Sequence, residues 1–395
     1  MERIGIYGGA FNPPHLGHIR GAQYALEALH LTKLLMIPSC VSPHKERPAF
    51  GEEPEQCLEL LKLSVEGLDG IEISDMELRR GGVSYTWQTV EQVRSMYPGA
   101  QLVLFMGTDM FLTFETWKCT DKLIKYCDLA VFYRGDPDEI RQIQEQKIHL
   151  ETMGARVHVL KNPITEISST QLRRMLVFQC ARPFMAPAAY EYVQKHGLYG
   201  TGRDYKNLPM QQLEPIAVSL HKPNRVRHIL GVRDTAKKLA KLYGADPVDA
   251  ERAGLLHDIT KALDGPLQLT LCAEYGKVLD IFSSRNPKTL HALTGSLVAE
   301  RIFGENQAVV EAIRSHTTGK ANMNLLQKIV YVADYMEPNR NFPGVEKLRD
   351  LAFQDIDQAL ELGLHMTLDH LKKQGKEVSP ESQEALEYLV STRKG

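Results

Sequence analysis

The stretch IGIYGGAFNPPHLGH, which spans residues 4–18, indicates how the first half of the chain folds. Its first four residues form the apolar run of a buried β-strand, and Gly8 and Gly9 end that run. A helix is expected to follow at residues 18–29. Glycines between a strand and a helix let the backbone approach a phosphate, whose charge the N–H groups and the dipole of the helix favour.

Short apolar runs alternate with longer amphipathic segments over the first 200 residues. Helices are expected at 55–68 and 86–96, among others, and further strands at 34–38, 71–73, 102–106, 129–132 and 157–160. The run LVLFM at 102–106 is apolar at every position, which is typical of a strand with both faces covered. This βαβα order predicts an α/β fold with a doubly wound, Rossmann-like parallel sheet, whose ligands bind beyond the carboxyl ends of the strands.

After residue 200 the apolar spacing becomes helical. A linker is expected at 201–207, and a last helix after Ser379 follows helices at 210–220, 224–243, 247–256, 266–275, 289–302, 307–315, 325–336, 345–351 and 355–374. The chain is therefore predicted to contain an α/β domain at 1–200 and an all-α helical bundle at 208–395.

Composition limits the classes of partner. The chain has 395 residues, 43% of them apolar and 24% charged, and a net charge of −2. This charge gives no electrostatic case for binding nucleic acid or an anionic membrane. Six cysteines without a C-x-x-C pair argue against a zinc–thiolate site. We find no signal peptide and no apolar run of the roughly 18 residues that a membrane helix needs, so we expect a cytoplasmic protein with free thiols.

Two segments of the first half can bind phosphate groups. His15 and His18 are three residues apart at a helix start, so both can face one side and donate hydrogen bonds to phosphoryl oxygens. The segment EISSTQLR at 166–173 places three hydroxyls at another helix start, with Arg173 close behind. Such hydroxyls either cap the helix or bind phosphate.

Together these segments resemble the nucleotidyltransferases that have the His-x-Gly-His signature, and among them the nicotinate mononucleotide adenylyltransferases. The resemblance covers roughly residues 1–200. It implies transfer of AMP from ATP to nicotinate mononucleotide, with deamido-NAD and pyrophosphate as products and Mg²⁺ bound mainly by the phosphates.

The same resemblance assigns site residues. It implies that His15, His18, Lys45 and Arg173 act on the phosphates. It implies that the nucleotides contact Gly8, Gly9, Ala10, Phe11, Tyr85, Thr86, Gly107, Asp109, Trp117, Arg134, Ile167, Ser168, Ser169 and Thr170, with Trp117 stacking on the pyridine ring. Two positions depart from the family pattern: Ala10 replaces the usual Thr or Ser, and Asn12 the usual Asp. Pantetheine phosphate or the amide mononucleotide as acceptor, and a nucleotide sensor without catalysis, stay open as alternatives.

The helical half contains a second group of polar residues, each on or near the end of a predicted helix. These are His228, His257, Asp258, His291, His316 and Asp334. Imidazole and carboxylate ligands suit Fe, Mn and other first-row divalent metals, and helices of a bundle can project them into one core. His257 and Asp258 are adjacent and would point apart within a helix, so they can act together only at a helix end or a kink.

The order of these residues resembles the HD superfamily, and the strings RVRH, HDITK and YVAD resemble its YqeK-type branch. The resemblance implies a metal at His228, His257, Asp258 and Asp334, and a second one involving His291 and His316. It also implies symmetrical cleavage of diadenosine tetraphosphate, a dinucleoside polyphosphate, to ADP, with Lys261 neutralising a phosphate or the leaving group. A general nucleotide phosphatase and a metal-stabilised interaction module stay open, as does the formation of a homo-oligomer.

Overall fold

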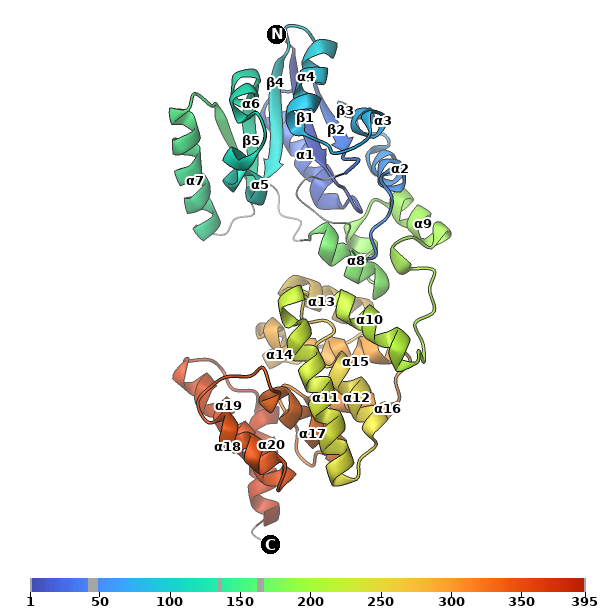
Figure 1. Ribbon diagram of the computed structural model, residues 1–395, viewed down its shortest axis with the longest axis vertical. Helices are drawn as coiled ribbons and strands as arrows, with labels where there is room; N and C mark the ends of the chain where they lie inside the picture. The colour runs from blue at the N-terminus through green and yellow to red at the C-terminus, as the bar shows by residue number, and fades with distance from the viewer. Residues whose placement is uncertain (1, 42–48, 134–136, 162–166, 394–395) are drawn as a thin grey trace. The chain divides into compact units, whose positions relative to one another are not determined.

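The computed structural model describes residues 2–41, 49–133, 137–161 and 167–393 (Figure 1). The chain divides into two compact units, Met1–Arg203 and Asp204–Gly395, called here the N-terminal unit and the C-terminal unit. None of the described helices is long and apolar enough to cross a lipid bilayer.

The N-terminal unit is built on a six-stranded sheet with the strand order β3-β2-β1-β4-β5-β6. All five neighbouring pairs are parallel. The strands are β1 (Arg3–Gly9), β2 (Lys33–Pro38), β3 (Ile71–Ile73), β4 (Gln101–Gly107), β5 (Cys127–Tyr133) and β6 (Val157–Lys161). After β3 the chain returns to the other side of β1, so the strand order reverses between β1 and β4. The carboxyl ends of these two strands are where a doubly wound sheet binds its ligand, and the predicted α/β fold is confirmed.

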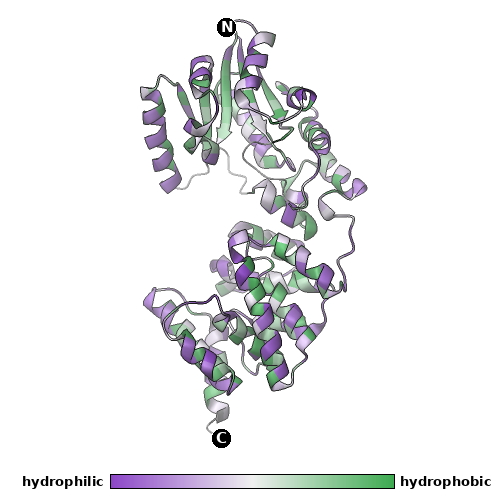
Figure 2. Cartoon of the chain, viewed as in Figure 1, coloured by the Kyte–Doolittle hydropathy of each residue, from purple (hydrophilic) through white to green (hydrophobic). Residues whose placement is uncertain are grey.

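Both faces of the sheet are covered, because successive side chains of β4 enter different hydrophobic clusters. Leu102, Leu104 and Met106 belong to one cluster, and Val103 and Phe105 to the other. The first face is packed by α3 (Met76–Arg80), α4 (Thr86–Met96), α5 (Thr108–Leu112), α6 (Thr120–Tyr126) and α7 (Pro137–Thr152), the second by α1 (Leu16–Ala28) and α2 (Pro54–Val65). In Figure 2 the strands are hydrophobic, while α7 is mainly hydrophilic. The unit is completed by η1 (Phe114–Thr116), α8 (Ser169–Val177), η2 (Arg182–Phe184), α9 (Pro187–His196) and η3 (Leu198–Gly200).

The described residues of the C-terminal unit form helices and no strands. The helices are α10 (Met210–Leu220), α11 (Val226–Tyr243), α12 (Pro247–Leu256), α13 (Gly265–Glu274), α14 (Ile281–Arg285), α15 (His291–Arg301), α16 (Gln307–Ser315), α17 (Leu325–Met336), α18 (Val345–Ala352), α19 (Ile356–Lys373) and α20 (Pro380–Arg393), with short turns η4 (Pro223–Arg225) and η5 (Pro287–Thr289). The predicted helix at 289–302 begins later, at His291, because 287–289 is a 3₁₀ turn. The all-α prediction is confirmed.

Candidate active sites

The first candidate site begins where β1 ends. His15 is the N-cap of α1, and its Nδ1 accepts the backbone N–H of His18 at 3.3 Å. His18 reciprocates, since its Nδ1 accepts the backbone N–H of His15 at 3.2 Å. The two rings stack with their centroids 3.6 Å apart. Because each Nδ1 accepts a hydrogen bond, the neutral ring has its proton on Nε2, which makes Nε2 the donor nitrogen.

Phe11 supports this pair of histidines from the preceding turn. Its backbone has a left-handed φ of 44°, and its side chain is buried. The ring lies edge-on to His18 with the centroids 5.0 Å apart. A Cβ at Gly9 would lie 3.2 Å from the Phe11 ring, while a Cβ at Gly8 would meet nothing within 4 Å. Gly9 thus makes room for Phe11, and Gly8 faces open space beside the exposed Ala10.

The start of α8 is fastened to the same turn. Ser169 Oγ donates to the carbonyl of Pro13 at 2.9 Å. Arg173 Nη1 donates to the carbonyl of Asn12 at 2.5 Å, and its Nη2 donates to Thr170 Oγ1 at 3.0 Å. Ser168 is the N-cap of α8, and the preceding Ile167 is buried. Two helix N-termini, each a favourable place for an anion, therefore meet at residues 12–13.

The Arg173 side chain is fixed by the protein and is not an exposed cation that could move to a substrate. Its side chain is buried, and burial lowers the pKa of the guanidinium. Both of its hydrogen bonds described above go to atoms of the protein, so Arg173 braces the turn that contains Asn12. Its positive charge lies one turn after the start of α8, a position from which it can attract a phosphate group.

The other predicted nucleotide contacts that the structure describes lie at the end of β4, at helix starts and after a 3₁₀ turn. Gly107 is the N-cap of α5 at the carboxyl end of β4, and Asp109 is in the first turn of that helix. Tyr85 and Thr86 begin α4, beside the segment that follows β2, because Ser84 N donates to the carbonyl of Val41. Trp117 packs against Phe114 with ring centroids 5.4 Å apart. Lys45 and Arg134 lie outside the described residues.

The second candidate site gathers side chains from five helix regions of the C-terminal unit. His228 is in the first turn of α11, His257 is the C-cap of α12 and Asp258 follows it. His291 begins α15, His316 is the C-cap of α16, and Asp334 is in the last turn of α17. His257 and Asp258 lie just beyond the end of α12, which lets both side chains point to one centre. The structure thus brings together all six predicted metal ligands.

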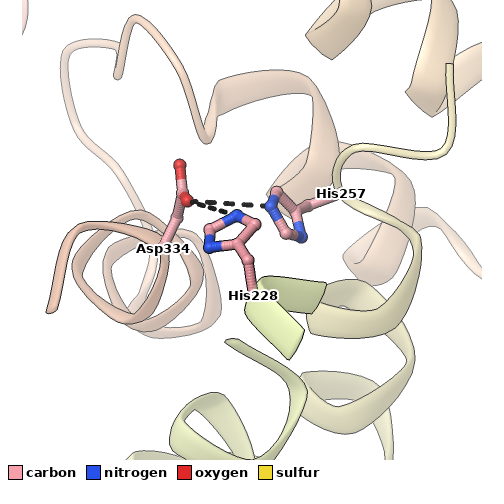
Figure 3. A group of neighbouring side chains, drawn as sticks. All are labelled: His228, His257 and Asp334. Atoms are coloured by element: carbon pink, nitrogen blue, oxygen red, sulfur yellow. Dashed lines mark ion pairs between the residues drawn. The ribbon is translucent and has the colours of Figure 1, made fainter. Parts of the chain in front are cut away.

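Three of these residues form the group in Figure 3. Asp334 Oδ1 lies 3.2 Å from His228 Nε2 and 3.7 Å from His257 Nε2. Both imidazole nitrogens are buried, and neither has a hydrogen-bond partner within the described part of the chain. Buried nitrogens of this kind that face a carboxylate oxygen fit a divalent cation.

Asp258 connects this group to the remaining histidines. Its Oδ2 lies 3.6 Å from His257 Nε2 and 3.8 Å from His228 Nε2. Its Oδ1 lies 3.3 Å from His291 Nε2 and 3.5 Å from His316 Nε2. One carboxylate therefore faces two pairs of imidazoles with its two oxygens, and these five side chains could hold one or two divalent ions.

The ring orientations suit metal ligands. Nδ1 of His257 donates to the carbonyl of Gly254 at 2.7 Å, and Nδ1 of His316 to that of Ile313 at 2.7 Å. Nδ1 of His291 lies 2.9 Å from the carbonyl of Lys288. A proton on Nδ1 leaves the lone pair on Nε2, the nitrogen that faces Asp258.

The protonation states are also those that a metal requires. Burial lowers the pKa of His257 to about 4 and that of His291 to about 3, so both rings are neutral near pH 7. Burial alone would raise the pKa of Asp258, but His257 and His316 hold it well below its ordinary value. The pKa of Asp334 is also well below its ordinary value, because the hydrogen bond with His228 and nearby charges together outweigh the effect of burial.

Three basic side chains lie beside the proposed metal ligands. Arg225 Nη2 donates to Asp258 Oδ2, and Arg340 Nη2 donates to Asp334 Oδ1 at 2.6 Å. Lys261 Nζ lies 2.8 Å from His291 Nε2, and burial lowers the pKa of this amine. Arg225 was not among the predicted site residues, although its spacing of three from His228 is a helical-turn signal that could have identified it.

Comparisons with known proteins divide the chain in the same way. The Cytidylyltransferase-like family model matches residues 6–175, and the HD domain model matches residues 225–339. A "Probable nicotinate-nucleotide adenylyltransferase" of Pseudomonas syringae pv. tomato is 32% identical over 211 residues, which are 50% of this chain and 94% of that protein. A symmetrical bis(5'-nucleosyl)-tetraphosphatase of Halalkalibacterium halodurans is 41% identical over 183 residues, which are 45% of this chain and 97% of that protein. The chain therefore belongs to two families. Its first half belongs to the family of this adenylyltransferase, and its second half belongs to the HD family of this tetraphosphatase.

The N-terminal unit is the adenylyltransferase-family unit, and the C-terminal unit is the HD-family unit. A solved HD superfamily hydrolase from Clostridium acetobutylicum is 36% identical, with 47% of this chain and 98% of that chain covered at a TM-score of 0.46. Divalent metal use follows from the HD family and from the ligand groups that its unit contains.

Proposed function

We propose that the adenylyltransferase-family unit, Met1–Arg203, transfers AMP from ATP to nicotinate mononucleotide. The observation that supports this most is the junction of two helix N-termini, where the stacked His15 and His18 begin α1 and Ser169 ties α8 to Pro13. That junction lies at the carboxyl end of β1, beside the point where the strand order reverses.

The reaction is an in-line displacement. A 5′-phosphate oxygen of nicotinate mononucleotide attacks the α-phosphorus of ATP, and the bond from that phosphorus to the bridging oxygen breaks. Deamido-NAD and pyrophosphate are formed. Mg²⁺, when bound with ATP, would neutralise negative charge on the phosphates. Nε2 of His15 and His18 donates to oxygens that gain negative charge, and Ser168, Ser169 and Thr170 hold the β- and γ-phosphates at the start of α8.

A substrate comparison tests this proposal. The purified chain is given ATP with nicotinate mononucleotide, its amide or pantetheine phosphate, and pyrophosphate release is measured. We expect kcat/KM to be highest for nicotinate mononucleotide. Faster turnover of either other acceptor would replace the proposed substrate, and binding of ATP without any turnover would favour the sensor.

We infer that the HD-family unit, Asp204–Gly395, hydrolyses a dinucleoside polyphosphate, namely diadenosine tetraphosphate to two ADP. The supporting observation is Asp258, whose two oxygens face two separate imidazole pairs. We propose that one or two ions of the Fe or Mn kind are held by His228, His257, Asp258 and Asp334 on one side and by His291 and His316 on the other. Bound divalent ions would supply polarisation of water and of phosphate oxygens.

The chain's own cations supply the rest of the chemistry. Water adds to a phosphorus, the P–O bond to the leaving ADP breaks, and the leaving oxygen gains negative charge. Arg225 and Arg340 contact the ligand carboxylates Asp258 and Asp334, and Lys261 lies beside His291. These three cations can neutralise the phosphates of the substrate. Their number suits a polyphosphate better than a monophosphate. We propose the cytoplasm as the location, since all of these substrates are nucleotides.

Elemental analysis and a hydrolysis screen test this proposal together. We expect bound Fe or Mn in the purified chain, and ADP as the product of diadenosine tetraphosphate. Faster cleavage of simple mononucleotides would favour a general phosphatase. A metal without any hydrolysis would favour the interaction module.

A further inference from the structure

Glu337 is a buried carboxylate beside the proposed metal centre, outside the six predicted ligands. It follows α17 as its C-cap, three residues after Asp334. Its side chain is only 1% exposed. A buried carboxylate needs partners that compensate for the loss of water, so its contacts indicate what it does.

Each oxygen of Glu337 has a different partner. Oε1 lies 3.2 Å from Nδ1 of His228. Oε2 accepts two hydrogen bonds from Asn339, from the backbone N–H at 2.7 Å and from Nδ2 at 2.8 Å. Asn339 Nδ2 is itself fixed to the carbonyl of Arg227 at 3.1 Å. Asn339 therefore occupies one side of the carboxylate and leaves the other side to His228.

The neighbouring helix leaves room for this carboxylate. A Cβ at Gly231 would lie 2.3 Å from Glu337 Oε2. Gly231 is one turn after His228 in α11, so the glycine and the histidine line the same helix face. Any larger residue there would displace the acid from its present place.

His228 also differs from the other three histidines. Their Nδ1 atoms donate to backbone carbonyls three residues earlier in the chain. The Nδ1 of His228 is hydrogen-bonded instead to the carboxylate of Glu337, at the end of α17. A carboxylate acceptor orients the ring and raises the basicity of the metal-binding nitrogen more than a neutral carbonyl does.

We propose that Glu337 is a positioning residue that keeps the proton of His228 on Nδ1 and directs its Nε2 lone pair toward the metal held with Asp334. This inference rests on the metal centre of the proposed function. It also explains how a ligand from α11 is kept at a fixed distance from a ligand on α17.

The substitution Glu337→Gln gives a sharp test because it preserves size and reverses polarity. The two N–H groups of Asn339 require an oxygen on their side, so the new amide N–H₂ must face Nδ1 of His228. His228 then accepts at Nδ1 and carries its proton on Nε2, where it opposes a metal. Glu305→Gln is the matched control, since Glu305 is a buried carboxylate of the same unit that pairs with Arg252.

Mn²⁺ binding to the full chain is measured by the loss of the free-ion electron paramagnetic resonance signal, with Fe²⁺ as a second probe under anaerobic conditions. We expect Glu337→Gln to weaken binding about 10- to 100-fold and Glu305→Gln to leave it unchanged. In the metal-free protein, ¹⁵N shifts of His228 should report a change from the Nδ1–H to the Nε2–H tautomer. A merely structural role of Glu337 would not produce this change.

Equal Mn²⁺ affinity of Glu337→Gln and the unsubstituted chain would overturn the positioning role while the metal centre stands. An unsubstituted chain that binds neither ion would overturn both. If Glu337→Gln does not fold, Asn339→Ala replaces it, because it removes one of the two donors that orient the acid. A smaller loss of affinity in the same direction supports the inference, and no loss overturns it.

Discussion

A histidine can donate a hydrogen bond to a phosphate or accept a metal ion, and at the residue scale the two units orient their histidines in these two opposite ways. Nδ1 of His15 and of His18 accepts a backbone N–H, so Nε2 donates. Nδ1 of His257 and of His316 donates to a backbone carbonyl, so Nε2 accepts. The same side chain thus presents opposite polarity, which suits phosphate oxygens in one unit and cations in the other.

The substitution His18→Ala tests the donor role. It should lower kcat for adenylyl transfer about 10²- to 10³-fold, since one preorganised donor to the developing charge is lost. Pyrophosphate release measures the effect. Hydrolysis of diadenosine tetraphosphate by the same preparation is the internal control and should not change. An unchanged rate of transfer would remove His18 from the proposed mechanism.

The substitution Gly231→Ala tests the space around Glu337. Its Cβ would stand 2.3 Å from Glu337 Oε2, so the acid must move away from His228. We expect weaker Mn²⁺ binding and slower hydrolysis. Gly363→Ala is the matched helical control, because its Cβ would make an ordinary contact at 3.4 Å with Tyr331. If the two variants bind Mn²⁺ alike, the close approach has no functional consequence.

At the scale of the elements, one buried ion pair fastens α12 to the turn after α15. Arg252 Nε and Nη2 each donate to a Glu305 oxygen at 2.6 Å, and its Nη1 donates to the carbonyl of Leu208 at 2.8 Å. Removing one partner leaves a buried charge without compensation. Arg252→Met should therefore lower the unfolding free energy of this unit by about 3–5 kcal/mol, and Arg252→Met/Glu305→Met by less.

The pH dependence of Arg252→Met provides the check. Burial raises the pKa of Glu305, and loss of Arg252 raises it further. When the pKa of a carboxyl is higher in the folded than in the unfolded state, its contribution to stability is fully present below the unfolded-state pKa. The protein loses this contribution as the pH rises through the folded-state pKa. Calorimetry should thus find the variant closest to the unsubstituted chain at acidic pH, below the unfolded pKa of a glutamate, and progressively less stable relative to it as the pH rises. A pH-independent difference would contradict this.

The sequence predicted elements well where local signals agree. The predicted bounds of α10, α12, α16 and α17 match the structure. Three of these helices begin after side-chain N-caps, Asp246, Asn306 and Asn324. The five-residue α14 was not predicted, because so short a helix shows no apolar period and its Ile281 is 72% exposed.

The candidate sites were predictable to the extent that motifs are local. The spacing of His15 and His18 places them on one helix turn, and the ligand order in the helical half follows the chain. Glu337 could not be found in this way, because it meets His228 across 109 positions of sequence. Its role depends on how α11 packs against α17, which no local pattern encodes.

At the scale of the whole molecule, the two proposed activities are chemically related. If a phosphate of a second ATP replaces the mononucleotide as the attacking group, adenylyl transfer produces a dinucleoside polyphosphate. The proposed hydrolysis would return that by-product to ADP. This is a hypothesis for the presence of both units in one chain, and it requires each unit to work without the other.

Two truncations test that independence, and the structure determines where to cut. Tyr199 is fully buried, and its N–H donates to Glu52 Oε1 at 2.6 Å. The backbone of Glu52 in turn pairs with the side-chain amide of Asn12 at 2.9 and 3.1 Å. A chain that ends at Arg203 retains this connection, while one that ends at Gly197 loses it.

The truncation at Arg203 should synthesise deamido-NAD within about twofold of the full chain and lack hydrolysis, because a unit with its own core folds alone. The second should lose both stability and synthesis, since the turn before His15 loses its support. Poor synthesis by both truncations would show that the helical unit supports the adenylyltransferase-family unit.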